Sequence, residues 1–302
     1  MGIEFDDSRV DVSGVDDRRG GGGGLGGGGL AIGGGTSVIG IVIYVLFQLL
    51  GGGGSSAAFP QLDSGSANST GRQESSEQLK ARCNGEDALK EYTDCRLIKV
   101  YDIADTTWSD EFNRRGIKYR APRLAFFAGA TSTACGNASA DIGPFYCPGD
   151  EEIYLDLGFL QQLQSQLGAG GEFAQAYILA HEYGHHLQTV LGTERKVRAA
   201  QERNPDAANK YSVAMELQAD CYAGVWSNLA DQQSSGINLT ADNIAEAQKA
   251  ASAVGDDRIQ QQSQGRVDPE SWTHGSAAAR KQWFTTGATT GDIDQCNTFS
   301  SL

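Results

Sequence analysis

Apolar residues recur at steps of three and four between residues 172 and 191, which is the period of an amphipathic α-helix. Phe173, Tyr177, Leu187 and Leu191 carry this pattern. Gly192 follows directly, and glycine is the residue best suited to end a helix. We therefore predict a helix over residues 172–191.

The other apolar patterns predict further helices and a few short strands. Helical spacing, with capping signals at Asn204-Pro205 and Thr240, predicts helices at about residues 86–115, 205–226, 240–254 and 277–284. Short apolar and aromatic runs between turn residues predict strands at 123–128, 143–148 and 152–156. The predicted fold class is α+β, mainly helical with a small sheet.

The strand at residues 152–156 precedes the helix of 172–191 in the chain. As an edge strand it would bind an extended peptide through main-chain hydrogen bonds. An ordinary internal strand explains the pattern equally well.

The first 78 residues differ in composition from the rest. Residues 1–29 are acidic and then glycine-rich, which predicts a disordered tail. Residues 30–50 carry no charge and are long enough for a transmembrane helix. Residues 51–78 read as a flexible linker, which leaves 79–302 as the folded domain.

The charges that flank the apolar run predict its orientation. Arg9, Arg18 and Arg19 precede residues 30–50, and no lysine or arginine follows until Arg72. The positive-inside rule then places the N-terminus in the cytoplasm. We expect a single-pass protein of the cell membrane with an extracytoplasmic domain.

All six cysteines follow the predicted span, and no Cys-x-x-Cys pair occurs. An even number on an extracytoplasmic side indicates three disulfides rather than a metal site. Nearest-neighbour pairing predicts the bonds 83–95, 135–147 and 221–296.

The chain has a net charge of −14 over 302 residues. A nucleic-acid-binding protein needs a basic surface, so we exclude nucleic acid as a partner. The acidic residues are better explained as a solvated surface.

The helix of 172–191 contains the motif His-Glu-x-x-His at His181, Glu182 and His185. Histidines four apart lie on one face of a helix and can bind one Zn²⁺ ion. Glu182 lies beside the first ligand, where it can act as general base on a zinc-activated water. So short a motif also arises by chance, but three of the four histidines of the chain lie in this one stretch.

A catalytic zinc needs a third protein ligand. Glu216 lies on the next predicted helix, and Asp220 follows four residues later on the same face. We predict Glu216 as the ligand and Asp220 as the acceptor for the second ring nitrogen of a ligand histidine. A solvated helix face would also carry such acids, but their neighbours here are mostly apolar.

These motifs resemble a known family. Glu-x-x-x-Asp after His-Glu-x-x-His is similar to the gluzincin arrangement of thermolysin-like peptidases. The strings at residues 181–188 and 216–226 are closer still to the bacterial putative neutral zinc metallopeptidase family, and Gly-Pro-Phe-Tyr-Cys-Pro at 143–148 fits it too. The resemblance covers about residues 79–299. It implies a zincin-like fold, Zn²⁺ as cofactor and peptide or protein substrates.

Two further histidines have open roles. His186 points away from the ligand pair on the helix and is better explained by packing or hydrogen bonding than as a third ligand. His274 is a candidate catalytic residue that stabilises the oxyanion, although it could equally cap the last helix. Tyr183, Tyr211 and Tyr222 are other candidates for the oxyanion.

The sequence therefore predicts a membrane-anchored zinc metallopeptidase with Glu182 as general base. The main alternative is a membrane-tethered zinc-binding scaffold or interaction protein without catalytic activity. A purely structural zinc site has no need of a base, so Glu182 speaks against this alternative. An amide hydrolase that acts on the cell wall remains a third hypothesis.

Overall fold

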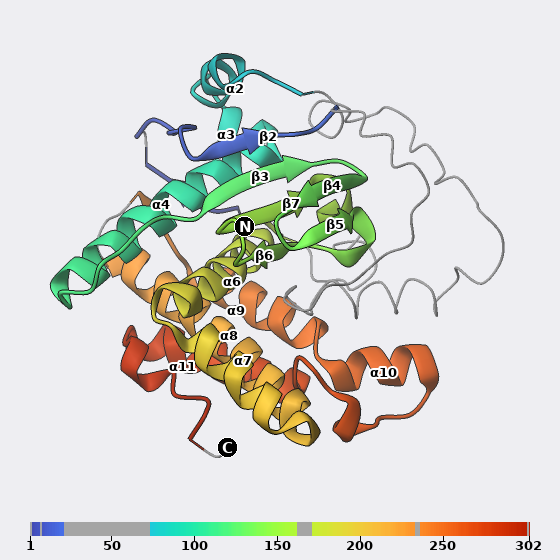
Figure 1. The fold of residues 1–302 in the computed structure, drawn as a ribbon. Coiled ribbons are helices and arrows are strands. Elements are labelled where there is room, and N and C mark those ends of the chain that lie inside the picture. The colour runs from blue at the N-terminus through green and yellow to red at the C-terminus, as the bar shows by residue number, and fades with distance from the viewer. Residues whose placement is uncertain (1, 7, 21–72, 162–170, 233–235, 301) are drawn as a thin grey trace.

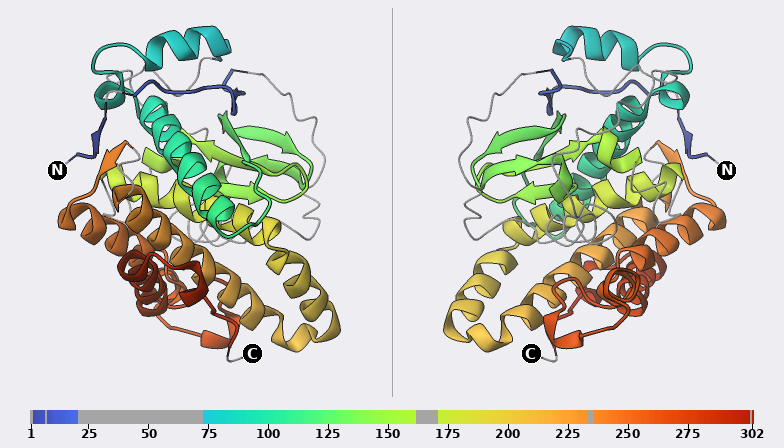
Figure 2. Two further views of the ribbon diagram at one scale, coloured as in Figure 1. Left: turned by 90° about the vertical axis from the view of Figure 1, so that its left-hand side faces the viewer. Right: turned by 90° about the vertical axis from the view of Figure 1, so that its right-hand side faces the viewer.

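The computed structural model describes residues 2–6, 8–20, 73–161, 171–232, 236–300 and 302 (Figure 1). A small sheet and the helices that precede it occupy one half of the molecule, and the C-terminal helices occupy the other (Figures 1 and 2). Helix α6 (Glu172–Val190) lies between the two halves. The prediction of an α+β fold that is mainly helical with a small sheet is confirmed.

The main sheet has four strands in the order β2-β3-β7-β6. Its strands are β2 (Val15–Asp17), β3 (Arg123–Phe127), β6 (Phe145–Cys147) and β7 (Glu152–Asp156). β3 pairs in parallel with β2 and β7, and β6 pairs antiparallel with β7. The three strands predicted from the sequence are confirmed. The suggestion that residues 152–156 form an edge strand is wrong, because β7 lies between β3 and β6.

Smaller elements surround this sheet. A separate hairpin pairs β4 (Ala130–Thr133) with β5 (Gly136–Ser139). The helices on this side are α2 (Ser76–Cys83), α3 (Ala88–Glu91) and α4 (Thr93–Arg114). Trp108 and Phe112 of α4 are fully buried and pack edge to face in the core.

The other half is helical. It contains α7 (Thr193–Arg203), α8 (Ala208–Gln232), α9 (Ala241–Ala253), α10 (Asp256–Gln264) and α11 (Ala277–Thr290). Thr240 caps α9 through a capping box, as its sequence predicts. Asn204-Pro205 starts a 3₁₀ turn, Pro205–Ala207, and α8 begins after it. Helices α2, α7 and α10 are absent from the prediction because few apolar residues mark them.

Close approach of α8 and α11 depends on glycine. A Cβ atom at Gly287 would lie 2.0 Å from the carbonyl oxygen of Cys221. Only a residue without a side chain fits there, so the two helix backbones touch. This contact sets the last turn of α11 against the middle of α8.

All three predicted disulfides are confirmed. The bonds join Cys83 to Cys95, Cys135 to Cys147 and Cys221 to Cys296. The last one ties the C-terminal end of the chain to the middle of α8.

The prediction of a disordered cytoplasmic tail over residues 1–29 is wrong where the structure describes it. β2 adds to the main sheet beside β3, and β1 (Glu4–Phe5) pairs with β8 (Ile237–Asn238). Val10, Val12 and Val15 are buried in the core. Their signal in the sequence is weak, because only three isolated valines lie among aspartates and arginines.

This packing also overturns the predicted membrane topology. A single span at residues 30–50 would place β2 and β3 on opposite sides of a bilayer, whereas they are hydrogen-bonded neighbours. Within the described ranges, no helix has the length and apolar character needed to cross a membrane. Residues 30–50 themselves, and the linker up to residue 72, lie outside the described residues. The fold class is therefore corrected to α+β, mainly helical with small sheets, and the prediction of a preceding transmembrane helix is withdrawn. The predicted localisation, with a cytoplasmic N-terminus and an extracytoplasmic domain, is withdrawn.

Candidate metal centre

Helix α6 places His181 and His185 one turn apart on the face that meets α8. Between them in sequence is Gly184, where a Cβ atom would lie 3.0 Å from both Cα and the carbonyl oxygen of Ala219. The missing side chain therefore allows α8 to approach α6 closely. This close approach brings the acidic residues of α8 to the two imidazoles.

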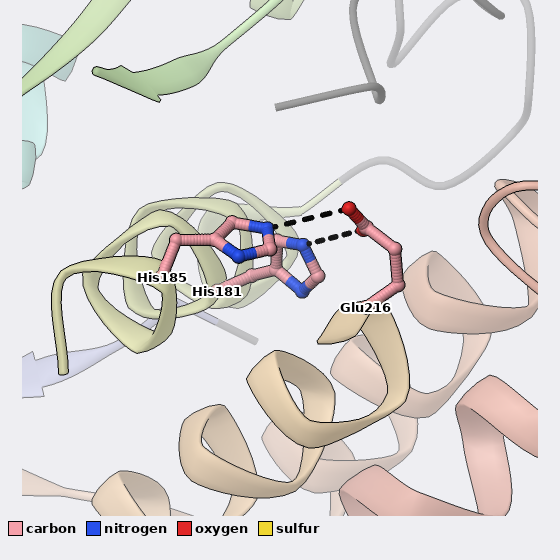
Figure 3. A group of neighbouring side chains, drawn as sticks. All are labelled: His181, His185 and Glu216. Carbon is pink, nitrogen blue, oxygen red and sulfur yellow. Dashed lines mark hydrogen bonds and ion pairs between the residues drawn. The ribbon is translucent and has the colours of Figure 1, made fainter. Parts of the chain in front are cut away.

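Glu216 of α8 faces both histidines (Figure 3). Its Oε2 lies 3.2 Å from Nε2 of His181, and its Oε1 lies 3.5 Å from Nε2 of His185. One ligand atom from each of the three residues lies within 4.8 Å of the others, and all three residues are buried. Two imidazoles and one carboxylate form the kind of donor set that holds a catalytic zinc with one position left open.

The second ring nitrogen of each histidine is also held. Nδ1 of His181 lies 2.9 Å from Oδ1 of Asp220, and Nδ1 of His185 lies 2.9 Å from Oε1 of Gln188. Gln188 in turn donates to the carbonyl oxygen of Met215 over 2.8 Å. With both Nδ1–H groups donating, both Nε2 atoms are left to bind a cation. Gln188 was missed in the sequence, although its i, i+3 spacing from His185 is the signal that could have found it.

The charges at this centre suit a cation. Burial alone would raise the pKa of Glu216, but His185, the hydrogen bond from His181 and the nearby His274 hold it well below its usual range. For His181, burial lowers the pKa, yet Asp220 and Glu216 outweigh it and raise it to about 9. In the metal-free chain a proton on His181 thus occupies the space between imidazole and carboxylate. A metal ion would replace that proton.

His185 differs from His181. Burial lowers its pKa to about 4, so it is neutral at physiological pH. Its Nε2 atom is buried and has no hydrogen-bond partner among the described residues. A buried imidazole nitrogen without a hydrogen-bond partner needs an explanation, and a metal ion bound between it and the neighbouring carboxylate would provide one.

Glu182 is fully buried beside His181. Neither of its carboxylate oxygens has a hydrogen-bond partner in the described part of the chain. Burial raises the pKa of Glu182 to about 7, and the nearby charge of Glu216 adds to this rise. A carboxyl group with this pKa can accept and release a proton near neutral pH.

His274 lies in the segment that leads into α11 and is also buried. Its Nδ1 atom is 3.1 Å from Oδ1 of Asp256, whose Oδ2 accepts the backbone N–H groups of residues 273–275. Its Nε2 atom has no partner among the described residues. Ser276, not His274, caps α11, since its side chain accepts from the N–H of Ala279.

The remaining candidates lie outside the ligand group. His186 uses both ring nitrogens elsewhere: Nδ1 lies 3.1 Å from the hydroxyl of Tyr146, and Nε2 lies 2.7 Å from the carbonyl oxygen of Arg120. The hydroxyl of Tyr183 is hydrogen bonded to that of Tyr119. Tyr222 packs against Trp108.

The helix, the spacing of the two histidines and the carboxylate from α8 are those of a zinc site of the His-Glu-x-x-His type. The model of the family described as "Putative neutral zinc metallopeptidase" matches residues 7–299, and the chain belongs to this family. The match begins at residue 7 and therefore includes β2. Membership implies Zn²⁺ as the cofactor, and the donor set described above fits that ion.

Relatives from bacteria match most of the chain. The protein is 48% identical over 215 residues to the uncharacterized protein YpfJ of Escherichia coli K12, which covers 71% of this chain and 72% of the relative. It is 46% identical over 225 residues to the uncharacterized protein Rv2575 of Mycobacterium tuberculosis, which covers 72% of this chain and 74% of the relative. No solved structure gives a significant match.

Proposed function

We propose that the protein is a zinc-dependent peptidase that hydrolyses peptide bonds in peptide or protein substrates. His181, His185 and Glu216 would hold the ion, and Glu182 would serve as the general base. Zinc bound there would polarise the substrate carbonyl and make a water molecule more acidic.

The observation that carries this proposal is the environment of Glu182. Keeping a carboxyl group buried with neither oxygen hydrogen bonded to a described residue costs free energy. A site that only binds zinc needs no such group, so Glu182 favours an enzyme over a catalytically silent scaffold. Glu182 would accept a proton from water and pass it to the amine that leaves.

His274 would assist the same reaction. Asp256 fixes the imidazole through Nδ1, which leaves Nε2 free to face a substrate. As an imidazolium, His274 would donate its Nδ1–H to Asp256 and its Nε2–H to the oxygen that becomes negative as the carbonyl is attacked. The charge of His274 contributes to the lowered pKa of Glu216, which supports a role for His274 beside the proposed ligands.

The mechanism is tested by Glu182→Gln in the full chain, with casein as substrate. We expect the variant to retain one zinc per chain and to lose cleavage by at least about a thousandfold. Glu152→Gln is the matched control, because Glu152 is also buried and one of its oxygens has no hydrogen-bond partner among the described residues, but it lies on β7. If Glu182→Gln cleaves casein at the rate of this control, the proposed mechanism is wrong.

A further inference from the structure

Arg280 is a buried arginine that lies behind the metal centre. It is on α11, one turn after the helix begins, and its side chain is 1% exposed. Nε of Arg280 donates to Oδ2 of Asp220 over 2.8 Å, and Nη2 donates to Oδ1 over 3.0 Å. The guanidinium therefore holds both carboxylate oxygens with its planar fork.

Asp220 is the meeting point of several donors. Besides Arg280, its Oδ1 accepts from the hydroxyl of Tyr177 over 2.5 Å and lies 2.9 Å from Nδ1 of His181. Nη2 of Arg280 also lies 3.3 Å from the Tyr177 hydroxyl and 3.4 Å from Nδ1 of His181. These contacts form a continuous hydrogen-bond network from Arg280 through Asp220 to His181.

The charges of these residues favour a cation beside His181 and Glu216. Asp220 and Glu216 lie one turn apart on α8, both buried, and two buried carboxylates repel each other. Arg280 compensates Asp220 directly, which leaves the charge of Glu216 for a metal. Without the guanidinium, Asp220 would lose its charge or turn away, and His181 would lose the acceptor that fixes its ring.

We propose that Arg280 is a positioning residue for the metal ligand His181 and that it acts through Asp220. This inference rests on the proposed zinc site, in which His181 binds through Nε2. Arg280 holds Asp220 in the one orientation in which it accepts the Nδ1–H of His181. Nε2 is thereby aimed at the space that it shares with Glu216.

Arg280 lies close in the chain to His274, the proposed catalytic histidine. His274 and Arg280 belong to one short segment, with the helix cap Ser276 between them. Nη1 of Arg280 also donates to the carbonyl oxygen of Val254 over 3.3 Å, shortly before Asp256 in the chain. One segment thus supplies both the orienting arginine and His274.

The test is the zinc affinity of full-length variants, measured by competition with a chromogenic chelator and compared with their unfolding midpoints. We expect Arg280→Met to weaken zinc binding about 10–100-fold. Arg280→Lys keeps the charge but not the fork, so we expect it to weaken binding at least about fivefold. If Arg280→Met does not fold, Arg280→Lys decides, and wild-type zinc affinity in the lysine variant overturns the proposal.

A double variant shows whether Arg280 acts through Asp220. In an Asp220→Asn background, Arg280→Met should cause almost no further loss of zinc affinity. Full additivity of the two losses overturns the proposed route. The control is Arg19→Met, because Arg19 is as buried as Arg280 but pairs with Asp17 and Asp94 near β2, at the opposite end of the molecule. It should lower the unfolding midpoint and leave zinc affinity unchanged, whereas an equal loss of affinity would overturn the proposal.

The same titrations separate this inference from the proposed function. If wild-type protein binds no zinc, or if His185→Ala binds it as well as wild type, then the metal site itself is misassigned and the inference fails with it. If His185→Ala loses zinc while Arg280→Met and Arg280→Lys bind it as wild type, only the role of Arg280 is wrong. Replacing zinc by Co²⁺ gives a second readout, since a turned His181 ring should change the visible absorption of the bound cobalt.

Discussion

Glu216 and Asp220, one helical turn apart on α8, lie next to opposite nitrogens of the same imidazole ring. Glu216 faces Nε2 of His181 at 3.2 Å, and Asp220 faces Nδ1 at 2.9 Å. The i, i+4 spacing therefore has two different uses on adjacent helices. On α6 the spacing aligns the two candidate ligands His181 and His185. On α8 it sets the candidate ligand Glu216 one turn from Asp220, which accepts from the ring of His181.

Gly184→Ala tests whether the close approach of α6 and α8 is needed to build the centre. A Cβ atom would meet the backbone of Ala219 at 3.0 Å, so the helices must move apart. We expect a loss of about 1–3 kcal/mol in the free energy of unfolding and at least a tenfold weaker zinc affinity. Chemical denaturation and chelator competition measure the two effects.

Ala104→Val is the control for overpacking, since Ala104 is fully buried on α4. It should lower stability by a similar amount without changing zinc affinity. Unchanged zinc affinity in a folded Gly184→Ala protein would contradict the role given to this glycine.

His274→Ala tests the assignment of His274 to the reaction rather than to the metal. The variant should keep its zinc and lose about a hundredfold in kcat/KM, because one hydrogen-bond donor to the developing oxyanion is missing. Asp256→Asn should cost less, about tenfold, since it only loosens the imidazole. Loss of zinc from His274→Ala would instead identify His274 as a ligand.

Much of the centre could be predicted because it is encoded locally. The period of residues 172–191 fixes the face on which His181 and His185 lie, and the same argument relates Glu216 to Asp220. The disulfides followed from simple nearest-neighbour pairing.

The rest depends on contacts between distant segments. Nothing in the sequence near Arg280 indicates that it reaches Asp220, sixty residues away along the chain. Asp256 is likewise joined to His274 only by the fold. The N-terminal strand was missed because three residues that pair in register with β3 carry almost no periodic signal.

Asp102 provides a prediction about pH that does not involve the metal. Burial raises the pKa of this α4 carboxyl to about 7, and the nearby charge of Asp11 adds to the rise. Between about pH 4 and pH 7 the folded chain keeps a proton that the unfolded chain has lost. Stability from this group is therefore fully present at low pH and is lost as the pH rises towards 7.

Asp102→Asn should remove this dependence. The amide oxygen can still accept the backbone N–H of Asp11, which now lies 2.7 Å from the carboxylate. The free energy of unfolding of the variant, relative to that of wild type, should rise by about 2 kcal/mol from pH 4 to pH 8. This value is reduced to allow for the partial exposure of Asp102. Denaturation curves at both pH values measure it, and an equal difference at both would show that Asp102 titrates normally.

The central claim is that His181, His185 and Glu216 hold one catalytic zinc. The most direct measurement is the zinc content of the purified full chain and of Glu216→Ala, with casein cleavage followed on both. The account predicts one zinc per wild-type chain, and loss of zinc together with cleavage in the variant. A Glu216→Ala protein that keeps its zinc and its activity would contradict the account, because the third ligand would then lie elsewhere.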